Sequence, residues 1–246
     1  DIVRSAEFWA ALEVTLLFTG LGVALVVALG VLMALLLDQP FPGRGFVRTM
    51  VLVPWAIPPV VNGLMWQWIY DAKVGALNGL LVSVGLLSSY RGWLSDPEGA
   101  LLALVTAHVW NALPLAVILL LAALQTIPGE LYDAGRVDGS GAWPLFRHIT
   151  LPWLAQPLLV VLVLQTMLAI RVFDLVYVLT AGGPGTATTT LVVVSMGRPT
   201  LGPATGGGGT AGTGGGGGLM ITGGLAVLGV GLGLLLLRRR RTDRPV

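Results

Sequence analysis

The chain has 246 residues, of which 55% are hydrophobic and 11% are charged, and its mean hydropathy is +0.85. A soluble domain carries about 25% charged residues, so this composition excludes an ordinary soluble protein and indicates a membrane protein. The chain has no cysteine and two isolated histidines, which excludes disulfides and thiolate metal sites and argues against a metal centre. The net charge of +2 does not indicate nucleic-acid binding, because the basic residues follow a membrane topology.

Five apolar runs are long enough to cross a bilayer as helices, which takes about 20 residues each. They cover residues 8–37, 47–70, 100–124, 153–179 and roughly 219–237. The runs are too long for strands and lack sustained alternation, so helices satisfy their backbone groups best. The sequence therefore predicts an all-α, polytopic membrane helical bundle that forms a single transmembrane domain over residues 1–246.

Two of these regions carry residues that disturb a regular helix. In the second run, Pro54, Pro58 and Pro59 must bend or break the helix; such a kink lines a pathway or belongs to a distorted packing helix. Before the fifth run, residues 202–218 contain eleven glycines. This composition is typical of flexible coil, and we expect an outer loop there.

The basic residues predict the orientation of the helices. Five arginines follow the last run, and the segments that alternate onto the same side hold Arg44, Arg136 and Arg147. The opposite side has few basic residues, so the positive-inside rule places the C-terminus in the cytoplasm. This solution puts Asp1 outside and needs an odd number of spans, which leads us to expect a further helix upstream of Asp1.

The cytoplasmic segment 125–152 is the one polar stretch in the middle of the chain. It contains "GELYDAGRVDGSGAWPLFRHITLP" from Gly129 to Pro152. Glycines and prolines predict a helix over 131–137, a break at Gly139 and Gly141, a second helix from Ala142, and a new span that opens at Pro152. A helix–turn–helix on a membrane bundle offers a soluble partner a surface to bind; an ordinary charged connection is the alternative.

This stretch resembles the EAA loop of binding-protein-dependent ABC importer permeases, with a triplet Asp133, Ala134, Gly135, then Gly139 and a distal I-x-L-P. Asp for Glu and Gly for the second Ala depart from the family pattern. The resemblance implies a type I importer permease with the MetI-like fold, whose loop is gripped by a cytoplasmic ATPase. The residues it implies in this coupling are Glu130, Asp133, Ala134, Gly135, Asp138, Gly139, Ile149, Leu151 and Pro152.

Two further stretches, "HVWNALP" and "RVFDLVYVLTAGGPGTATT", are similar to the carbohydrate branch of that family, the maltose, trehalose and glycerol-phosphate type. The resemblance covers roughly residues 8–191. It implies a multi-pass subunit of a prokaryotic plasma (inner) membrane, in contact with lipid, a sugar substrate, a second related permease in a heterodimer, two ATP-binding subunits and an extracytoplasmic solute-binding protein. ATP and Mg would bind those ATPase subunits, with no cofactor in this chain.

A sugar path needs a few polar groups that face inward, because such groups are costly in lipid. Arg171 and Asp174 lie three residues apart, so on a helix they could pair with each other instead of touching solute. His108 is also compatible with a buried structural histidine. Taken with the resemblance, the expected path residues are His108, Trp110, Asn111, Leu115, Arg171 and Asp174.

Two other functions compete with an importer permease. The chain lacks G-x-x-x-x-G-K-[ST], H-E-x-x-H and G-x-S-x-G, which argues against an ATPase, a metalloprotease or a serine hydrolase. We therefore expect no enzyme activity in this chain and ATP hydrolysis in separate subunits. An ion-driven secondary transporter is the remaining alternative; it commonly shows internal repeats, and the two halves show no convincing repeat.

Overall fold

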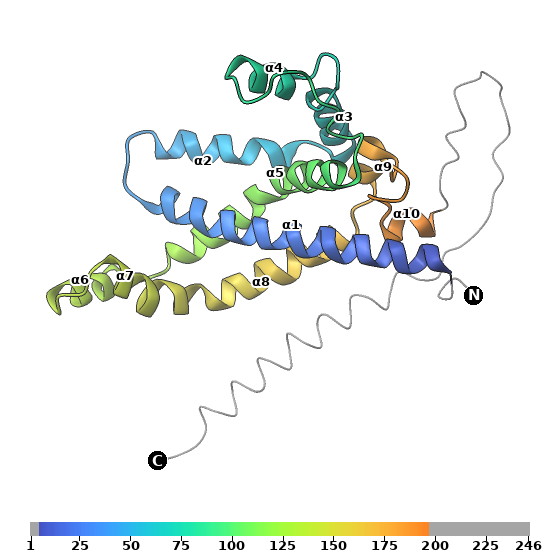
Figure 1. Ribbon diagram of the computed structural model, residues 1–246. Helices are drawn as coiled ribbons and strands as arrows, with labels where there is room; N and C mark the ends of the chain where they lie inside the picture. The colour runs from blue at the N-terminus through green and yellow to red at the C-terminus, as the bar shows by residue number, and fades with distance from the viewer. Residues whose placement is uncertain (1–4, 197–246) are drawn as a thin grey trace, which may run out of the picture.

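The computed structural model describes residues 5–196, and within this range the chain is helical and forms no strand (Figure 1). The predicted all-α architecture is confirmed there. The glycine-rich segment 202–218, the fifth predicted span and the arginine-rich tail lie outside the described residues. The elements are α1 (Ala6–Asp38), α2 (Arg44–Leu52), η2 (Val53–Ala56), α3 (Pro59–Ile69), α4 (Ala76–Ser83), α5 (Pro97–Leu124), α6 (Gly129–Val137), α7 (Ala142–Leu145), η3 (Phe146–Thr150), α8 (Leu151–Ile170), α9 (Asp174–Thr180) and α10 (Leu191–Ser195).

Three long helices, α1, α5 and α8, run side by side and form the body of the molecule (Figure 1). Within residues 5–196, the segments Ala6–Asp38, Pro97–Leu124 and Ala142–Ile170 are each long and apolar enough to cross a membrane, and one bent helix pair is a possible fourth span. The polar loop with α6 and α7 lies at one end of this body, and α9, α10 and the start of α1 lie at the other.

The contact between α1 and α5 depends on small residues. A Cβ atom added at Gly22 would lie 3.3 Å from the His108 ring, and one at Gly30 would lie 3.2 Å from Cβ of Ala116. Small residues let helix backbones approach closely in membranes. The opposite face of α1 carries exposed leucines suited to lipid contact, including Leu17, Leu21, Leu25, Leu29 and Leu36.

The second predicted span is not one helix. It consists of α2, the short η2 and α3, and the two halves are bent by 97° at the break. Pro58 and Pro59 have no backbone N–H, and the residue before a proline avoids the α conformation; Ile57 is extended, with ψ of 123°. The expected break is confirmed, and its sharpness turns α3 away from α2 (Figure 1).

The fourth predicted span has different limits. The helix begins at Ala142 and continues through η3 and α8 to Ile170, so the prediction of one helix over 153–179 is wrong. Pro152 lies inside this helix instead of opening it. The π-helical turn η3 comes just before Pro152, where the proline's missing N–H and bulky ring disturb the regular hydrogen-bond ladder.

The connection 71–96 is organised around one buried amide. Asn78 on α4 is fully buried and donates to the carbonyls of Asp71 (3.0 Å) and Arg91 (2.9 Å), while its oxygen accepts from the Trp93 indole (2.9 Å). At its start, the N–H groups of Val74 and Lys73 bond the Asp71 carboxylate and hold its pKa below the usual value. The connection is therefore a folded unit with its own helix.

Candidate coupling loop and substrate path

The turn between α6 and α7 depends on the backbone of Gly139. Its φ is +77°, a conformation that costs other residues about 1–2 kcal/mol. The N–H of Gly139 bonds the Arg136 carbonyl (3.0 Å), and the N–H of Ser140 bonds the Gly135 carbonyl (2.9 Å). These two bonds form a Schellman motif, which ends α6 and sets the direction in which α7 leaves. The predicted helix–turn–helix is present.

Gly135 is the point of contact between the two arms of the loop. A Cβ atom at this position would collide with Cδ2 of Leu145 on α7 and would lie 3.8 Å from Cδ1 of Ile149 on η3. The departure from the family triplet therefore has a local reason, since glycine lets α6 pack directly on the following helix.

We expect Gly135→Val to destabilise the chain by about 1–3 kcal/mol, because overpacking a close contact forces the neighbouring side chain or backbone to move. Thermal unfolding of the purified chain in detergent should show this loss of stability as a lower midpoint temperature for the variant. Leu145→Ala should restore most of the loss by making room. Gly129→Ala is the matched control, because a Cβ there meets no heavy atom within 4 Å; equal midpoints for the valine and alanine variants would contradict the packing role.

Two side-chain hydrogen bonds tie the loop to the membrane helices. The hydroxyls of Tyr132 and Thr150 lie 2.9 Å apart and join α6 to η3, and the Trp153 indole donates to Thr126 Oγ1 (3.1 Å), joining α8 to the chain that leaves α5. Since α7, η3 and α8 form one helix, the loop is continuous with a segment long enough to cross a membrane.

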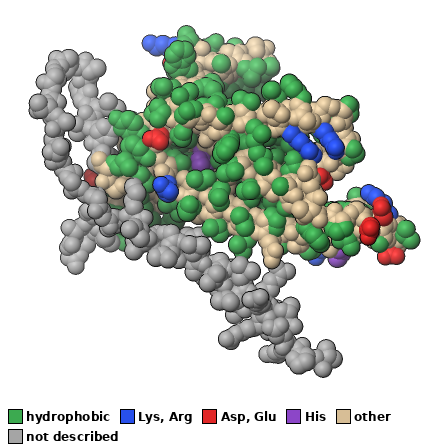
Figure 2. Space-filling view, turned by 180° about the vertical axis from the view of Figure 1, so that it is seen from behind, with side chains coloured by type: hydrophobic (Ala, Val, Ile, Leu, Met, Phe, Trp, Pro, Cys, Tyr) green, Lys and Arg blue, Asp and Glu red, His purple; other side chains and the backbone are tan. Residues whose placement is uncertain are grey.

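Charged residues lie on the solvent-exposed surface of the loop. In Figure 2, the red and blue side chains gather at the end of the molecule that carries α6 and α7. Asp133 and Arg136 form an exposed ion pair of 2.8 Å, worth little by itself in water. The predicted helix began at residue 131, but α6 begins at Gly129, so the acidic residue in its first turn is Glu130 and Asp133 lies beyond that turn.

The predicted coupling residues are brought together on this loop. Four of them project on α6 or its end, the two glycines shape the turn, and three lie on η3 and the start of α8. The exposed members are Glu130, Asp133, Ala134, Asp138, Gly139, Leu151 and Pro152, while Gly135 and Ile149 are half-buried.

Sequence reasoning missed the apolar residues of the same surface. Val137 is 87% exposed and Trp143 is 68% exposed, and the Trp143 ring lies 5.7 Å from that of Phe146. Exposed apolar side chains are typical of contact surfaces where they form a patch, which makes these residues candidates for a partner contact. A signal was available in the sequence, because both are apolar residues inside the most polar stretch of the chain.

The candidate path residues on α5 point to different neighbours. His108 is 6% exposed and lies against Phe18 (5.1 Å between ring centroids) and Gly22 of α1. Trp110 meets the edge of Trp66 on α3 at 5.9 Å, and Leu115 is half-buried. His108 is thus packed between two helices, as the structural alternative expected.

Asn111 is bonded to the break in the second span. Its side-chain amide donates to the carbonyls of Pro54 (2.7 Å) and Ile57 (3.3 Å). Both partners are acceptors, which fixes the orientation of the amide. The side-chain nitrogen of Asn111 is therefore engaged by backbone carbonyls.

Arg171 and Asp174 do not share a helical face. Arg171 lies just past the last residue of α8, and Asp174 begins α9 after a non-helical step. Both residues are exposed, and the ion pairs found among residues 5–196 do not join them. The prediction that they lie on one face of a single helix is wrong, because the helix ends at Ile170.

The stretch after α9 folds into a compact turn at the end of the molecule opposite α6. Ala181, Gly182 and Gly185 have positive φ, and the Gly183–Pro184 bond is cis. The buried Thr188 hydroxyl bonds the Thr180 hydroxyl (2.6 Å) and the Gly183 carbonyl (2.8 Å). The glycines and threonines of "LTAGGPGTATT" are thus explained by the turn itself.

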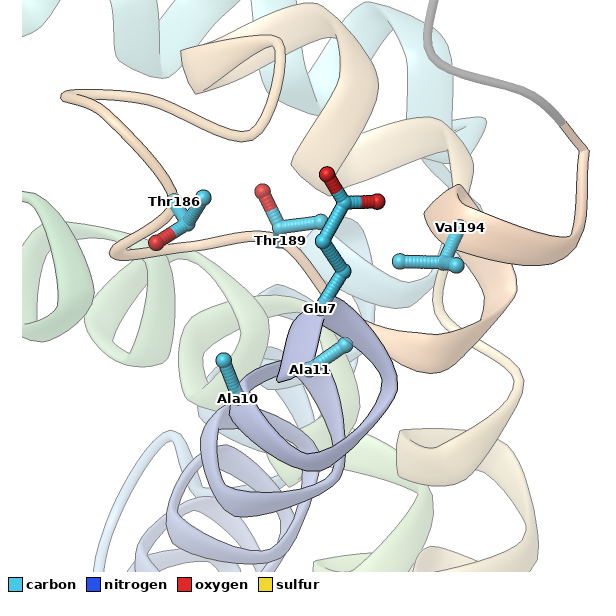
Figure 3. A pocket seen from close by; sticks show the side chains of 6 residues that line it. All are labelled: Glu7, Ala10, Ala11, Thr186, Thr189 and Val194. Carbon is cyan, nitrogen blue, oxygen red and sulfur yellow. The ribbon is translucent and has the colours of Figure 1, made fainter. Parts of the chain in front are cut away.

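A small pocket of about 140 Å³ lies between this turn and the start of α1 (Figure 3). The Glu7 carboxylate and the Thr186 and Thr189 side chains face it, and Thr189 also donates to the Gly182 carbonyl (2.9 Å). Its lining is Glu7, Ala10, Ala11, Thr186, Thr189 and Val194. The candidate path residues do not line this pocket.

Comparisons with known proteins agree with this architecture. The chain is 41% identical over 201 residues to the trehalose/maltose transport system permease protein MalF of Thermococcus litoralis, covering 82% of this chain and 68% of that protein. It is 36% identical to the sulfoquinovosyl glycerol transport system permease protein SmoG of Agrobacterium fabrum, covering 76% and 60%. The trehalose transport system permease protein SugA of Mycobacterium tuberculosis is 34% identical, with 78% and 60% covered. The chain thus spans about 60–70% of the length of these relatives.

A solved structure has the same fold. The chain superposes with a TM-score of 0.68 and 26% identity on a bacterial ABC transporter involved in the import of the acidic polysaccharide alginate, covering 76% of this chain and 65% of that one. The same transporter in complex with an alginate pentasaccharide-bound periplasmic protein gives the same values. Residues 26–241 match the family described as binding-protein-dependent transport system inner membrane component. This chain belongs to that family of multi-pass membrane permeases.

Proposed function

We propose that this chain is a membrane-spanning permease subunit of an ATP-driven sugar importer. The observation that carries the proposal is the α6–α7 loop: a polar helix–turn–helix with exposed Val137 and Trp143, continuous with a helix long enough to cross a membrane. The names of the relatives, which transport trehalose, maltose or a sulfoquinovosyl glycerol, support a carbohydrate as the solute.

The proposed assembly contains this permease, a second related permease, two ATP-binding subunits and an external solute-binding protein. The ATPase subunits would bind ATP and Mg, and the α6–α7 loop would contact them. A periplasmic partner is supported by the alginate transporter, whose structure includes a sugar-bound periplasmic protein. The charge distribution favours a cytoplasmic α6–α7 loop and C-terminus, which leaves the Figure 3 pocket on the outer side.

We further propose that the solute passes beside α5, along the side that meets the broken second span. Trp110 offers an aromatic surface there, and Arg171 and Asp174 are exposed beyond the end of α8. Leu115 is half-buried further along α5. His108 packs against α1 instead, as a structural residue. Asn111 borders the path, with its side-chain nitrogen held by the backbone of the break.

Reconstituted uptake tests this function. The full chain, assembled with its partner subunits and binding protein in proteoliposomes, should accumulate one sugar from a panel of trehalose, maltose, sulfoquinovosyl glycerol and an alginate oligosaccharide only when ATP and Mg are enclosed. Uptake that needs no ATP and stops when a proton or sodium gradient is collapsed would identify an ion-driven transporter and contradict the proposal.

A further inference from the structure

The helix α2 has few attachments to the rest of the molecule. None of its side chains from Arg44 to Leu52 is buried. From the middle of α2, the Arg48 guanidinium donates to the Leu37 carbonyl at the end of α1 (2.8 Å). At its other end the chain enters η2, which packs against α5, and the side-chain hydrogen bonds from α5 to the break come from the Asn111 amide.

The break exposes backbone groups that a continuous helix would satisfy. In a regular helix the Pro54 carbonyl would accept from the N–H of residue 58, but residue 58 is proline and has none. The Ile57 N–H reaches the Pro54 carbonyl at 3.2 Å, and Asn111 adds a shorter bond of 2.7 Å. Irregular backbone within a membrane persists where neighbouring groups satisfy it, and Asn111 does so for two carbonyls at once.

The far side of the break is fixed independently. Asn62 on α3 is 1% exposed and donates to the Ala107 carbonyl of α5 (3.3 Å). A Cβ atom at Gly63 would lie 2.9 Å from Val178 on α9, so α3 packs directly against that helix. With α3 held on two sides, the angle to α2 is set where η2 packs against α5, and there the Asn111 amide supplies the side-chain hydrogen bonds to the break.

We infer that Asn111 is a positioning residue that holds the break between α2 and α3 in its bent geometry, and that its amide shapes the wall of the path without binding solute. The transport part of this inference rests on the proposed import function; the geometric part does not. A direct solute ligand would change the solute concentration needed for half-maximal uptake, whereas a positioning residue changes the maximum rate.

The geometric part is tested by a distance across the break. The chain has no cysteine, so Met50→Cys and Leu64→Cys, at two side chains that are each 48% exposed, place spin labels on α2 and α3 of the full chain in lipid nanodiscs. We expect one narrow distance peak for the labelled parent chain. Asn111→Ala and the isosteric Asn111→Asp, which has no N–H to donate, should broaden or shift it, and Asn111→Gln should largely preserve it.

Gln165→Leu is the matched control, because it removes another buried amide that donates to α5, at Ala112, without touching the break. Should the single variants fail to insert, the triple variant Asn111→Ala, Pro58→Ala, Pro59→Ala decides. It restores an N–H to residues 58 and 59, and we expect a longer distance as the two helices straighten. An unchanged distance in Asn111→Ala and Asn111→Asp, or a triple variant that stays bent, would overturn the inference.

The transport part is measured in the reconstituted importer with the sugar that the uptake panel identifies. Asn111→Ala should lower the maximum uptake rate roughly tenfold, as expected from the loss of one or two hydrogen bonds, with an unchanged half-saturating concentration. A raised half-saturating concentration at an unchanged maximum rate would show direct solute contact and reject the positioning role. If the parent chain shows no ATP-driven uptake, the proposed function fails, and the distance measurements still decide the geometric part.

Discussion

We expect Gly139→Val to lower the rate of ATP-driven uptake by the assembled importer at least about tenfold. The chain should still insert into the membrane. The φ of +77° at Gly139 is an outlier for a β-branched residue, so valine forces the turn into another conformation. The Schellman bonds are then lost and α7 leaves α6 in a different direction. Uptake in proteoliposomes and the amount of chain in the membrane fraction measure the two effects separately.

Two neighbouring substitutions control for this result. Gly139→Asn should retain most uptake, because asparagine tolerates the left-handed conformation at the end of a helix. Gly141→Ala should be neutral, since Gly141 has an ordinary φ of −76° and a Cβ there meets no heavy atom within 4 Å. Full uptake by Gly139→Val would show that the shape of this turn has no part in coupling.

The second large effect is expected at Trp143, on the exposed surface of the loop. Trp143→Ala removes a side chain that is 68% exposed in the isolated chain. Tryptophans at the centre of an interface commonly contribute about 2 kcal/mol or more to binding, so the affinity of the ATPase subunit for the permease should fall about 30-fold. A binding titration of purified ATPase against the permease in detergent measures this directly.

Trp9→Ala provides the matched control for this titration. Trp9 is 57% exposed and lies near the start of α1, at the opposite end of the molecule from α6 and α7 (Figure 1). This variant tests whether loss of any exposed tryptophan lowers the measured affinity for the ATPase subunit. Equal affinities for the parent chain and Trp143→Ala would remove Trp143 from the proposed contact surface.

Composition and hydropathy predicted the class of fold and most of the long helices, because length and apolarity decide what can cross a bilayer. The limits of the elements were less predictable. The apolar run continues past Ile170 into Leu175 and Val176, but the helix ends at Ile170, with Arg171 as its C-cap. Hydropathy alone therefore does not show where this helix ends. A helix start at Ala142 was predicted, but its continuation into the span was not, because Pro152 looks like a first-turn proline, whereas η3 accommodates it inside a helix.

The coupling loop was the most predictable part of the candidate site, because glycines and prolines fix its turns locally. The path residues were less predictable, because their roles depend on contacts between distant segments. Nothing near Asn111 in the sequence shows that its amide bonds Pro54 and Ile57, which are more than fifty positions away. Within the loop, the need for a small residue at Gly135 also became clear only from a packing contact, the one with Leu145 on the following helix.

The single helix from Ala142 to Ile170 has a mechanical consequence. At about 1.5 Å per residue, roughly 15 Å of it lies between Trp143 and Trp153, and roughly 26 Å lies between Trp153 and Ile170. If the hydrogen bond from Trp153 to Thr126 acts as a fulcrum, the inner arm is the shorter one. A small swing applied at α7 would then be enlarged nearly twofold at the far tip, where the chain turns into α9.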